Sequence, residues 1–260
     1  MRRLMVLDWK SGKNVEDAKF NGYTEHPMQV ASYAKAYNLE AAAAGEELIT
    51  ASGLVYLDKE TGRPRFIDTT EGMETNFAAF CAAREYFRLK VEPTASDKRF
   101  YKYGGERFPS VTTILGILDK PALIQWAANC AVECLENVME EIRNPKTSQA
   151  RIEQLLLEAK KNFRAVSRKA MDIGTVIHNA IQTHLHGGDP SNLLDGNEAA
   201  QTGFLAFLEW AGKVKLEVLA LEKPLFHPGL RYAGTPDFIG HVDLNGAAAM
   251  SAEKEELDVF

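Results

Sequence analysis

The chain has few cysteines, no long apolar run and no excess of positive charge. Its 260 residues include three cysteines, too few and odd in number for a disulfide framework. No apolar stretch approaches the ~18 residues of a membrane-spanning helix, and the amino terminus lacks the hydrophobic segment of a signal peptide. A phosphate-binding Gly-x-x-x-x-Gly-Lys-Ser/Thr loop is also missing, so any coupling to strand unwinding needs a partner. We therefore expect a soluble cytoplasmic protein without a membrane partner.

The formal net charge of −6 excludes a generally basic surface. Any contact with nucleic acid must therefore depend on a local basic patch. Lys160, Arg164 and Arg168 are spaced by four, which places them on one face of a predicted helix where they could follow a DNA backbone. The alternative is a solvated helix face whose charges pair with Glu153 and Glu158.

Hydrophobic periodicity predicts both strands and amphipathic helices along the chain. Strands are expected at residues 3–8, 48–57, 64–68, 216–225 and 232–244. Helices are expected at residues 25–39, 73–89, 121–142 and 197–214, with one or two more between 149 and 186. The polar, proline-containing stretch 90–98 is the best candidate for a linker.

Two short apolar strands carry the most informative side chains. One ends in Asp8-Trp9-Lys10 and the other contains Pro236-Asp237. Residues i and i+2 of a strand share a face, so Asp8 and Lys10 lie on the same side. If the Asp237 strand is a neighbour, two acids and an amine converge. Such acids hold a divalent cation while a lysine positions or deprotonates water, which suits hydrolysis of a phosphodiester.

Five motifs follow a recognisable order when the carboxyl-terminal half is placed before the amino-terminal half. They are Gly174-x-x-x-His178, Glu222, Gly234-Thr235-Pro236-Asp237, Asp8-Trp9-Lys10 and Gln29-x-x-x-Tyr33. This series resembles the RecB-type branch of the PD-(D/E)XK nucleases, and within it phage exonucleases and the mitochondrial genome maintenance exonuclease. Relative to that family the chain is circularly permuted. A tight turn near Asn245-Gly246 is replaced by free ends, and the usual termini are joined through residues 90–98.

The resemblance implies a restriction-endonuclease-like α/β core, with a mixed central sheet flanked by helices and a helical subdomain as a cover. Residues 1–89 would form the second half of a single nuclease domain, 90–99 the linker, 100–190 the cover, 191–246 the first half and 247–260 a tail. If the linker is too short to close within one molecule, two chains would complete each other as a domain-swapped dimer. Otherwise the protein is a monomer.

The resemblance also implies roles at the metal site. Asp237 and Asp8 would bind Mg²⁺ or Mn²⁺, and Lys10 would act on the attacking water. His178 would add a ligand, and imidazole suits manganese better than magnesium. The ordinary alternative for His178 is a satisfied histidine of the core or surface.

Three further residues are placed beside the site by the resemblance. Glu222 would be a catalytic carboxylate near the ion, and its alternative is a surface strand residue paired with Lys223. Gln29 and Tyr33 are one helical turn apart and share a face. Gln29 would bond to the catalytic lysine or backbone and Tyr33 would contact a DNA phosphate. Their alternative is the ordinary surface of an amphipathic helix.

The function implied is a metal-dependent exonuclease that acts on single-stranded DNA in replication, repair or recombination, in the cytoplasm of a bacterial or phage-infected cell. Ser11 and Lys13 follow the catalytic strand and are further candidates for phosphate contacts. A flap endonuclease and a non-catalytic DNA-binding module are the alternatives, although the filled acid and lysine positions argue against the second. No iron–sulfur cluster is expected, because three cysteines cannot supply the four ligands that some members carry.

Overall fold

A computed structural model describes residues 2–17, 20, 22–95 and 100–243. The chain divides into two compact units, one of residues 119–175 and a larger one made from the segments on either side. The helical unit is narrower than the subdomain predicted at 100–190, because residues 100–118 and 176–190 belong to the larger unit. The expected turn near Asn245-Gly246, the tail and residues 96–99 of the linker lie outside the described residues.

A five-stranded mixed sheet forms the centre of the larger unit, in the order β3-β2-β1-β9-β6. The strand β1 is parallel to β2 and antiparallel to β9, and the two outer pairs are antiparallel. These strands are β1 (Arg2–Gly12), β2 (Ala51–Asp58), β3 (Pro64–Asp68), β6 (Leu216–Leu221) and β9 (Phe238–Asp243). The expectation of an α/β protein with a mixed central sheet is therefore confirmed.

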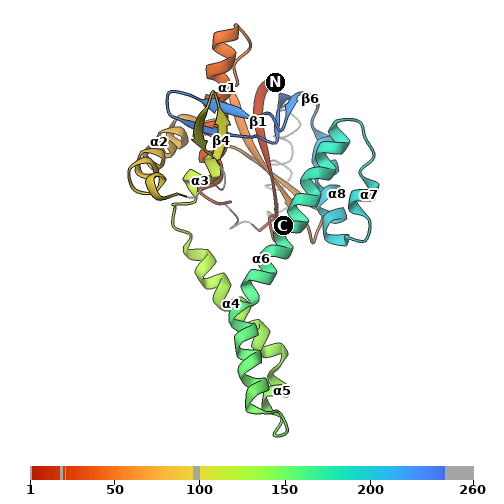
Figure 1. The fold of residues 1–260 in the computed structure, drawn as a ribbon. Coiled ribbons are helices and arrows are strands. Elements are labelled where there is room, and N and C mark those ends of the chain that lie inside the picture. Colours follow the sequence, from red (N-terminus) through yellow and green to blue (C-terminus); the bar gives the residue numbers. More distant parts are fainter. Residues whose placement is uncertain (1, 18–19, 21, 96–99, 244–260) are drawn as a thin grey trace, which may run out of the picture. The chain divides into compact units, whose positions relative to one another are not determined.

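Helices cover both faces of this sheet in the larger unit (Figure 1). The helices α1 (Glu25–Ala44) and α2 (Met73–Lys90) pack on one side, and α8 (Glu198–Lys213) packs on the other. Each helix contributes a row of buried apolar side chains to the core. Burial on both faces explains why β1 is an almost continuous apolar run rather than an alternating one.

The alternation of side chains along β1 assigns its two faces. Leu4 and Val6 belong to the core cluster that includes α1 residues. Trp9 points to the opposite face, where its ring meets Phe207 and Trp210 of α8 edge-on at centroid distances of 5.4 and 5.5 Å. Because residues two apart share a face, Asp8 and Lys10 lie on the α1 side. The sheet thus separates the polar end of β1 from an aromatic core.

Shorter elements complete the larger unit. They are η1 (Glu92–Thr94), β4 (Phe100–Tyr103), β5 (Glu106–Pro109), α3 (Val111–Leu115), α7 (Ser191–Leu194), β7 (Leu225–His227) and β8 (Tyr232–Gly234). The single strand predicted at 232–244 is wrong, because β8 ends at Gly234 and β9 begins at Phe238. Pro236 lies in the break and has no N–H to donate to a ladder.

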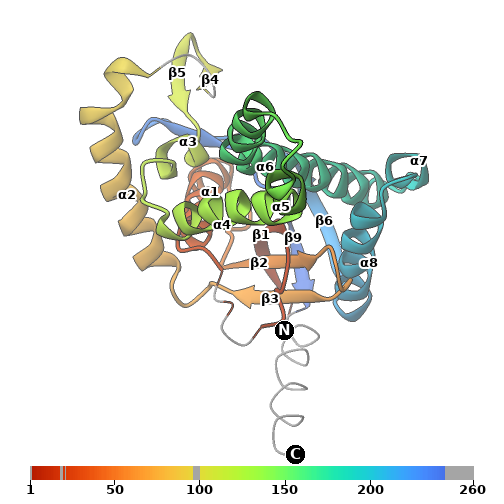
Figure 2. The same ribbon diagram turned by 90° about the horizontal axis from the view of Figure 1, so that it is seen from below.

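Three helices form the smaller unit, α4 (Pro121–Asn137), α5 (Met139–Arg143) and the first part of α6 (Gln149–Leu185), labelled in Figure 2. The helix predicted at 121–142 is interrupted at Val138, whereas 149–185 forms one continuous helix. The Asn162 side chain donates to the Cys130 carbonyl at 2.9 Å and ties α6 to α4. None of the described helices combines the length and apolar character needed to cross a membrane.

Candidate metal centre

The register of β1 and β9 brings two carboxylates together. Leu7 lies opposite Phe238, so the next step along both strands places Asp8 opposite Asp237. The Trp9 backbone N–H donates to Asp237 Oδ2 at 2.6 Å and fixes that carboxylate against β1. Asp8 and Asp237 are only 2% and 9% exposed. The predicted convergence of Asp8 and Asp237 is therefore present within one chain.

A β-bulge in β6 brings a third carboxylate, that of Glu222, beside Asp237. The pairing of β6 with β9 shifts by one residue around Leu219, so that Leu221 lies opposite Phe238. The Glu222 N–H then donates to the Asp237 carbonyl at 3.3 Å, and Glu222 has a left-handed φ of 48°. Without the bulge Leu221 would lie opposite Asp237, because a one-residue slip exchanges the faces of a strand. The bulge thus places an acid, not a leucine, beside Asp237.

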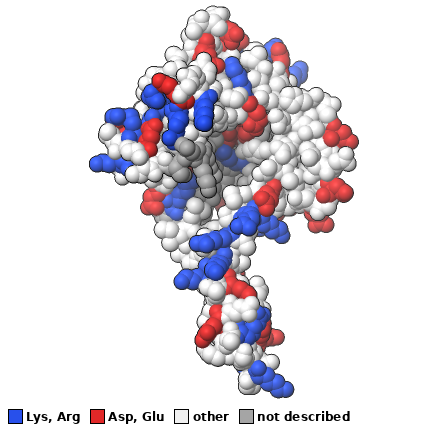
Figure 3. All heavy atoms as spheres, viewed as in Figure 1, with Lys and Arg blue, Asp and Glu red and all other residues white. Residues whose placement is uncertain are grey.

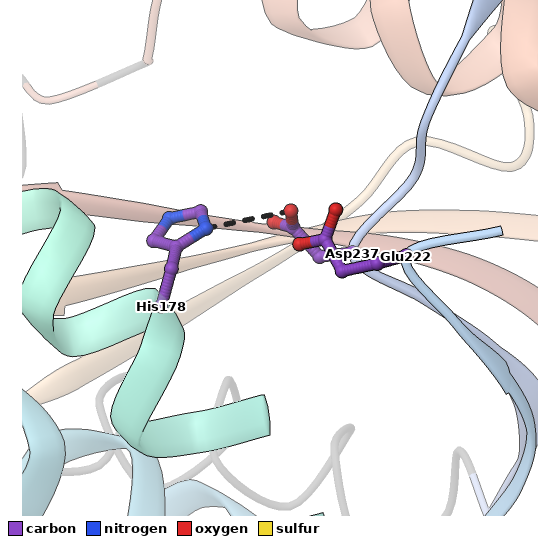
Figure 4. A group of neighbouring side chains, drawn as sticks. All are labelled: His178, Glu222 and Asp237. Carbon is purple, nitrogen blue, oxygen red and sulfur yellow. Dashed lines mark ion pairs between the residues drawn. The ribbon is translucent and has the colours of Figure 1, made fainter. Parts of the chain in front are cut away.

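His178 approaches the same carboxylate from α6. Its Nδ1 lies 3.4 Å from Asp237 Oδ1. This end of α6 packs closely on α8, since a methyl group added at Gly203 would lie 2.4 Å from Ile177 Cδ1. One nitrogen of His178 and one oxygen each of Glu222 and Asp237 all lie within 4.8 Å of one another, and the three side chains point toward one another (Figure 4). These three residues could hold a metal ion.

Gln29 links Asp8 to Lys10. The Lys10 ammonium contacts Asp8 Oδ2 as an ion pair and donates to Gln29 Oε1 at 3.1 Å. Gln29 Nε2 donates to Asp8 Oδ1 at 3.3 Å and to the Tyr33 hydroxyl at 2.9 Å. Among the described residues, none offers Asp8 Oδ2 an aligned hydrogen bond, although that atom is buried. Asp8 therefore lies beside the group of three potential ligands, with its two oxygens held by Lys10 and Gln29.

Crowding of the acids changes their proton affinities. Burial, and then the Asp237 charge, raise the pKa of Asp8 to about 6. Partial burial and the same charge raise the pKa of Glu222 to about 7. Burial alone would raise the pKa of Asp237 as well, but His178 and Lys10 hold it below its ordinary value. Asp237 is therefore the carboxylate that stays ionised most readily, and a cation would relieve the repulsion among the three.

The basic groups respond in the opposite direction. Burial alone would lower the pKa of His178, yet the Asp237 carboxylate raises it to about 9. Burial would also lower the pKa of Lys10, whereas Asp8 and Asp237 raise it above its ordinary value. Without a bound cation, both groups are therefore protonated at neutral pH. A metal ion would have to displace the proton of His178 to use its nitrogen.

Tyr33 does not occupy the position expected for a DNA contact. It is 3% exposed, and its hydroxyl accepts a hydrogen bond from Gln29. Its ring covers Gly234, where an added methyl would lie 2.3 Å from Tyr33 Cε1. Burial raises the pKa of its hydroxyl well above the ordinary value. The predicted contact with a phosphate is thus corrected to a buried contact that supports Gln29.

Other predicted residues lie outside this cluster. Ser11 is half-buried after Lys10, and the exposed Lys13 forms an ion pair with Glu60. Lys223 was the alternative partner suggested for Glu222. Its Nζ instead lies 3.3 Å from Glu40 Oε2, with which it forms an ion pair. Two of the expected phosphate contacts, Ser11 and Lys13, therefore remain predictions.

The predicted basic stripe lies on α6 in the helical unit. Lys160, Arg164 and Arg168 are exposed, and no ion pair joins them to Glu153 or Glu158 in the part of the chain that the structure describes. Those two acids accept hydrogen bonds from neighbouring glutamines instead. Figure 3 shows Lys and Arg atoms gathered along the same helix. The stripe is therefore a cluster of exposed positive charge that has no ion pair to either predicted acid among the described residues.

Two contributions to the site were missed from the sequence. One is the Trp9 N–H, a backbone donor whose role cannot be recognised from the type of residue. The other is Glu25, which is 8% exposed and whose charge helps to raise the pKa of Lys10. Glu25 precedes Gln29 by four residues on the same helix, so their shared face was a usable signal.

Comparison of the chain with protein-family models, with curated proteins and with solved structures finds no match in any of the three. The function must therefore be argued from the site itself.

Proposed function

We propose that the protein is a metal-dependent phosphodiester hydrolase of the RecB-type PD-(D/E)XK kind. The observation that carries this proposal is the convergence of Asp8 and Asp237 from neighbouring antiparallel strands, with Lys10 two residues beyond Asp8 on the same face. His178 and Glu222 complete a compact set of nitrogen and oxygen donors around Asp237. Two acids, a lysine and an additional imidazole suit metal-assisted hydrolysis better than purely structural packing.

The donor set suits Mg²⁺ or Mn²⁺. Asp237, Glu222 and His178 would hold the ion, with Asp8 beside them. Burial, and then the charge of Asp237, raise the pKa values of Asp8 and Glu222, so these carboxylates repel one another unless a cation is bound between them. Carboxylate oxygens suit both ions, and the imidazole favours Mn²⁺. When bound, the ion would polarise a phosphate oxygen and lower the pKa of a water.

Lys10 acts in its charged form. Without a bound cation, the charges of Asp8 and Asp237 hold the pKa of Lys10 above its ordinary value, so the group is an ammonium at neutral pH. Gln29 and Asp8 hold its Nζ in place. From that position the ammonium donates hydrogen bonds to the attacking water or to the phosphate, and it offsets the negative charge that develops in the transition state. Removal of a proton from water is then left to the carboxylates.

The circular permutation is part of the same proposal. Arg2, at the start of β1, lies opposite Asp243, at the end of β9. A short turn between these positions would join the two strands as a hairpin, which is the connection expected in an unpermuted chain. This adjacency supports the proposed rearrangement of the family order. It also leaves the two strands that carry the acids directly paired.

We further propose that the substrate is single-stranded DNA and that hydrolysis starts from an end, in replication, repair or recombination. The exposed basic stripe Lys160, Arg164 and Arg168 supports a contact with a nucleic-acid backbone. The choice of an exonuclease rests on the family resemblance.

The proposal is tested by digestion of end-labelled linear single strands, duplexes and a closed single-stranded circle, with Mn²⁺, Mg²⁺ or EDTA. We expect metal-dependent loss of linear single strands, an intact circle, and cleavage that is slower by about 10²–10³-fold in Lys10→Ala. Cleavage of the circle would identify an endonuclease instead. No cleavage of any substrate by the folded protein would leave a DNA-binding module and refute the catalytic proposal.

A further inference from the structure

The turn that follows β2 carries a lysine that the metal centre does not use. Lys59 is only 8% exposed, although a lysine is almost never that buried unless it is paired. Within the described part of the chain, no carboxylate forms an ion pair with Lys59 and no group hydrogen-bonds to its ammonium. Burial of an unpaired charge costs free energy, which a bound anion would offset.

The two acids that flank Lys59 in the sequence already have other partners. The Asp58 carboxylate accepts hydrogen bonds from three backbone N–H groups, at 2.8, 2.9 and 3.1 Å. Glu60 forms an ion pair with Lys13. Burial, and then the positive charge of Lys13, lower the pKa of Lys59. The surroundings of Lys59 therefore oppose its charge.

Lys59 lies where the parallel strands β1 and β2 both end. Its N–H donates to the Gly12 carbonyl at 3.1 Å, so the pairing of the two strands continues to this residue. A methyl group added at Gly203 of α8 would lie 3.7 Å from Lys59 Cβ and 2.4 Å from Ile177 Cδ1. Lys59 is therefore on the α8 side of the sheet, beside the turn of α6 that supplies His178.

A hydroxyl without a partner lies on the same face. Ser11 is opposite Leu57, and Leu57 shares a face with Lys59 because the two are two residues apart. Ser11 is half-buried, and its side chain forms no hydrogen bond with any residue that the structure describes. Lys13 follows two residues later, and its ion pair with Glu60 is exposed and contributes little. A hydroxyl and two ammonium groups are suitable donors for a phosphate.

We propose that Lys59 and Ser11, with Lys13 beside them, bind a phosphate group, either in a nucleic-acid backbone or as the free ion. At about 3.3 Å per residue, Ser11 lies about 10 Å along β1 from Asp8. This is comparable with roughly three nucleotides at the ~3.4 Å rise of B-form DNA. The site therefore suits a phosphate a few nucleotides from the one at the metal centre. That assignment rests on the proposed nuclease function, whereas binding of a phosphate group does not.

Binding is tested in EDTA, without cleavage, and inorganic phosphate is the first probe. Lys59→Met removes the ammonium but keeps an unbranched side chain in the packed position. The melting temperature of the wild type should rise by about 3–6 °C when phosphate is about ten times its dissociation constant. Lys59→Met should show only the general stabilisation that phosphate gives through exclusion from protein surfaces.

A labelled oligothymidylate is the second probe, followed by fluorescence anisotropy over a range of salt. Lys59→Met should reduce the slope of log affinity against log salt by about 0.7, the value for one phosphate contact on a single strand. Lys59→Arg keeps the charge and should retain the slope. Ser11→Ala should weaken binding by about tenfold, as for one hydrogen bond to a charged group, without a change of slope. The control Lys213→Met removes a cation that pairs with Glu209 on α8 and should behave as the wild type.

The outcomes separate this inference from the proposed function. Equal responses of the wild type and Lys59→Met to both probes would overturn the site. A difference with phosphate alone would support a site for the free ion, and a difference with the oligonucleotide alone would support a site for the backbone. Either difference, with no cleavage of any strand by the wild type, would support the site and refute the nuclease. Cleavage that depends on Lys10, with wild-type responses in Lys59→Met, would overturn the site and leave the nuclease.

Discussion

The variant Gln29→Leu tests whether the Gln29 amide holds the side chains of Lys10 and Asp8 in place. Gln29 is 6% exposed, and its amide makes hydrogen bonds of 3.1 Å with Lys10, 3.3 Å with Asp8 and 2.9 Å with Tyr33. Leucine has a similar size but neither donates nor accepts. The variant therefore removes all three bonds, while the ion pair between Lys10 and Asp8 remains.

The cost follows from the chemistry of these bonds. Hydrogen bonds to charged groups contribute about 1.5–3 kcal/mol each, and the remaining ion pair offsets part of the loss, so we expect a net loss of about 2 kcal/mol in unfolding free energy. At roughly 2–4 °C per kcal/mol for a unit of this size, the melting temperature should fall by about 4–8 °C. Loss of orientation at Lys10 and Asp8 should reduce the rate of hydrolysis by about 10²-fold.

The assay combines thermal unfolding by circular dichroism with single-turnover cleavage of end-labelled single strands at saturating Mn²⁺. Gln29→Glu keeps an acceptor for Lys10 but turns a carboxylate toward Asp8, so it should lose comparable activity. The control is Gln125→Leu, which removes an exposed amide that donates a hydrogen bond to Asn129 on the same helix, α4. A folded Gln29→Leu variant with the wild-type rate would refute the assigned role.

Three other predictions address the same site. Lys10→Ala should reduce hydrolysis by about 10²–10³-fold, as for loss of one preorganised donor, while calorimetry still detects Mn²⁺ binding; an unchanged rate would remove Lys10 from the mechanism. Mn²⁺ affinity should rise as the pH increases from about 6 to about 9, because Glu222 and His178, with pKa values of about 7 and about 9, must lose their protons; a flat pH profile would contradict this. Gly234→Ala should cost about 1–3 kcal/mol, measured by chemical denaturation, because its methyl would collide with the Tyr33 ring; unchanged stability would show that this contact relaxes freely.

The sequence predicted the parts of the site that depend on local pattern. The spacing of Asp8 and Lys10 placed both on one face of a strand, and the four-residue spacing of Gln29 and Tyr33 placed both on one face of a helix. Both expectations agree with the structure, in which Gln29 bonds to Asp8, Lys10 and Tyr33. Pro236 could also have predicted the break between β8 and β9, because proline cannot donate to a ladder.

Tertiary features were less accessible. The bulge at Leu219 that brings Glu222 beside Asp237 depends on the pairing of β6 with β9, which no local pattern encodes. The burial of Tyr33 depends on its contact with Gly234, a residue 201 positions away in the numbering. A polar hydroxyl on an amphipathic helix predicts exposure unless the opposing backbone is known. These features concern packing between distant segments.

The most direct test of the account is a calorimetric titration of the protein with Mn²⁺. We predict one tightly bound ion per chain, with binding weakened by about 10–100-fold or more in Asp237→Asn and in Glu222→Gln, at least the cost of losing an outer-shell partner. Glu217→Gln, on the same strand β6 and paired with Arg2, should bind Mn²⁺ as the wild type does. Equal affinity in all four proteins would contradict a metal centre at His178, Glu222 and Asp237.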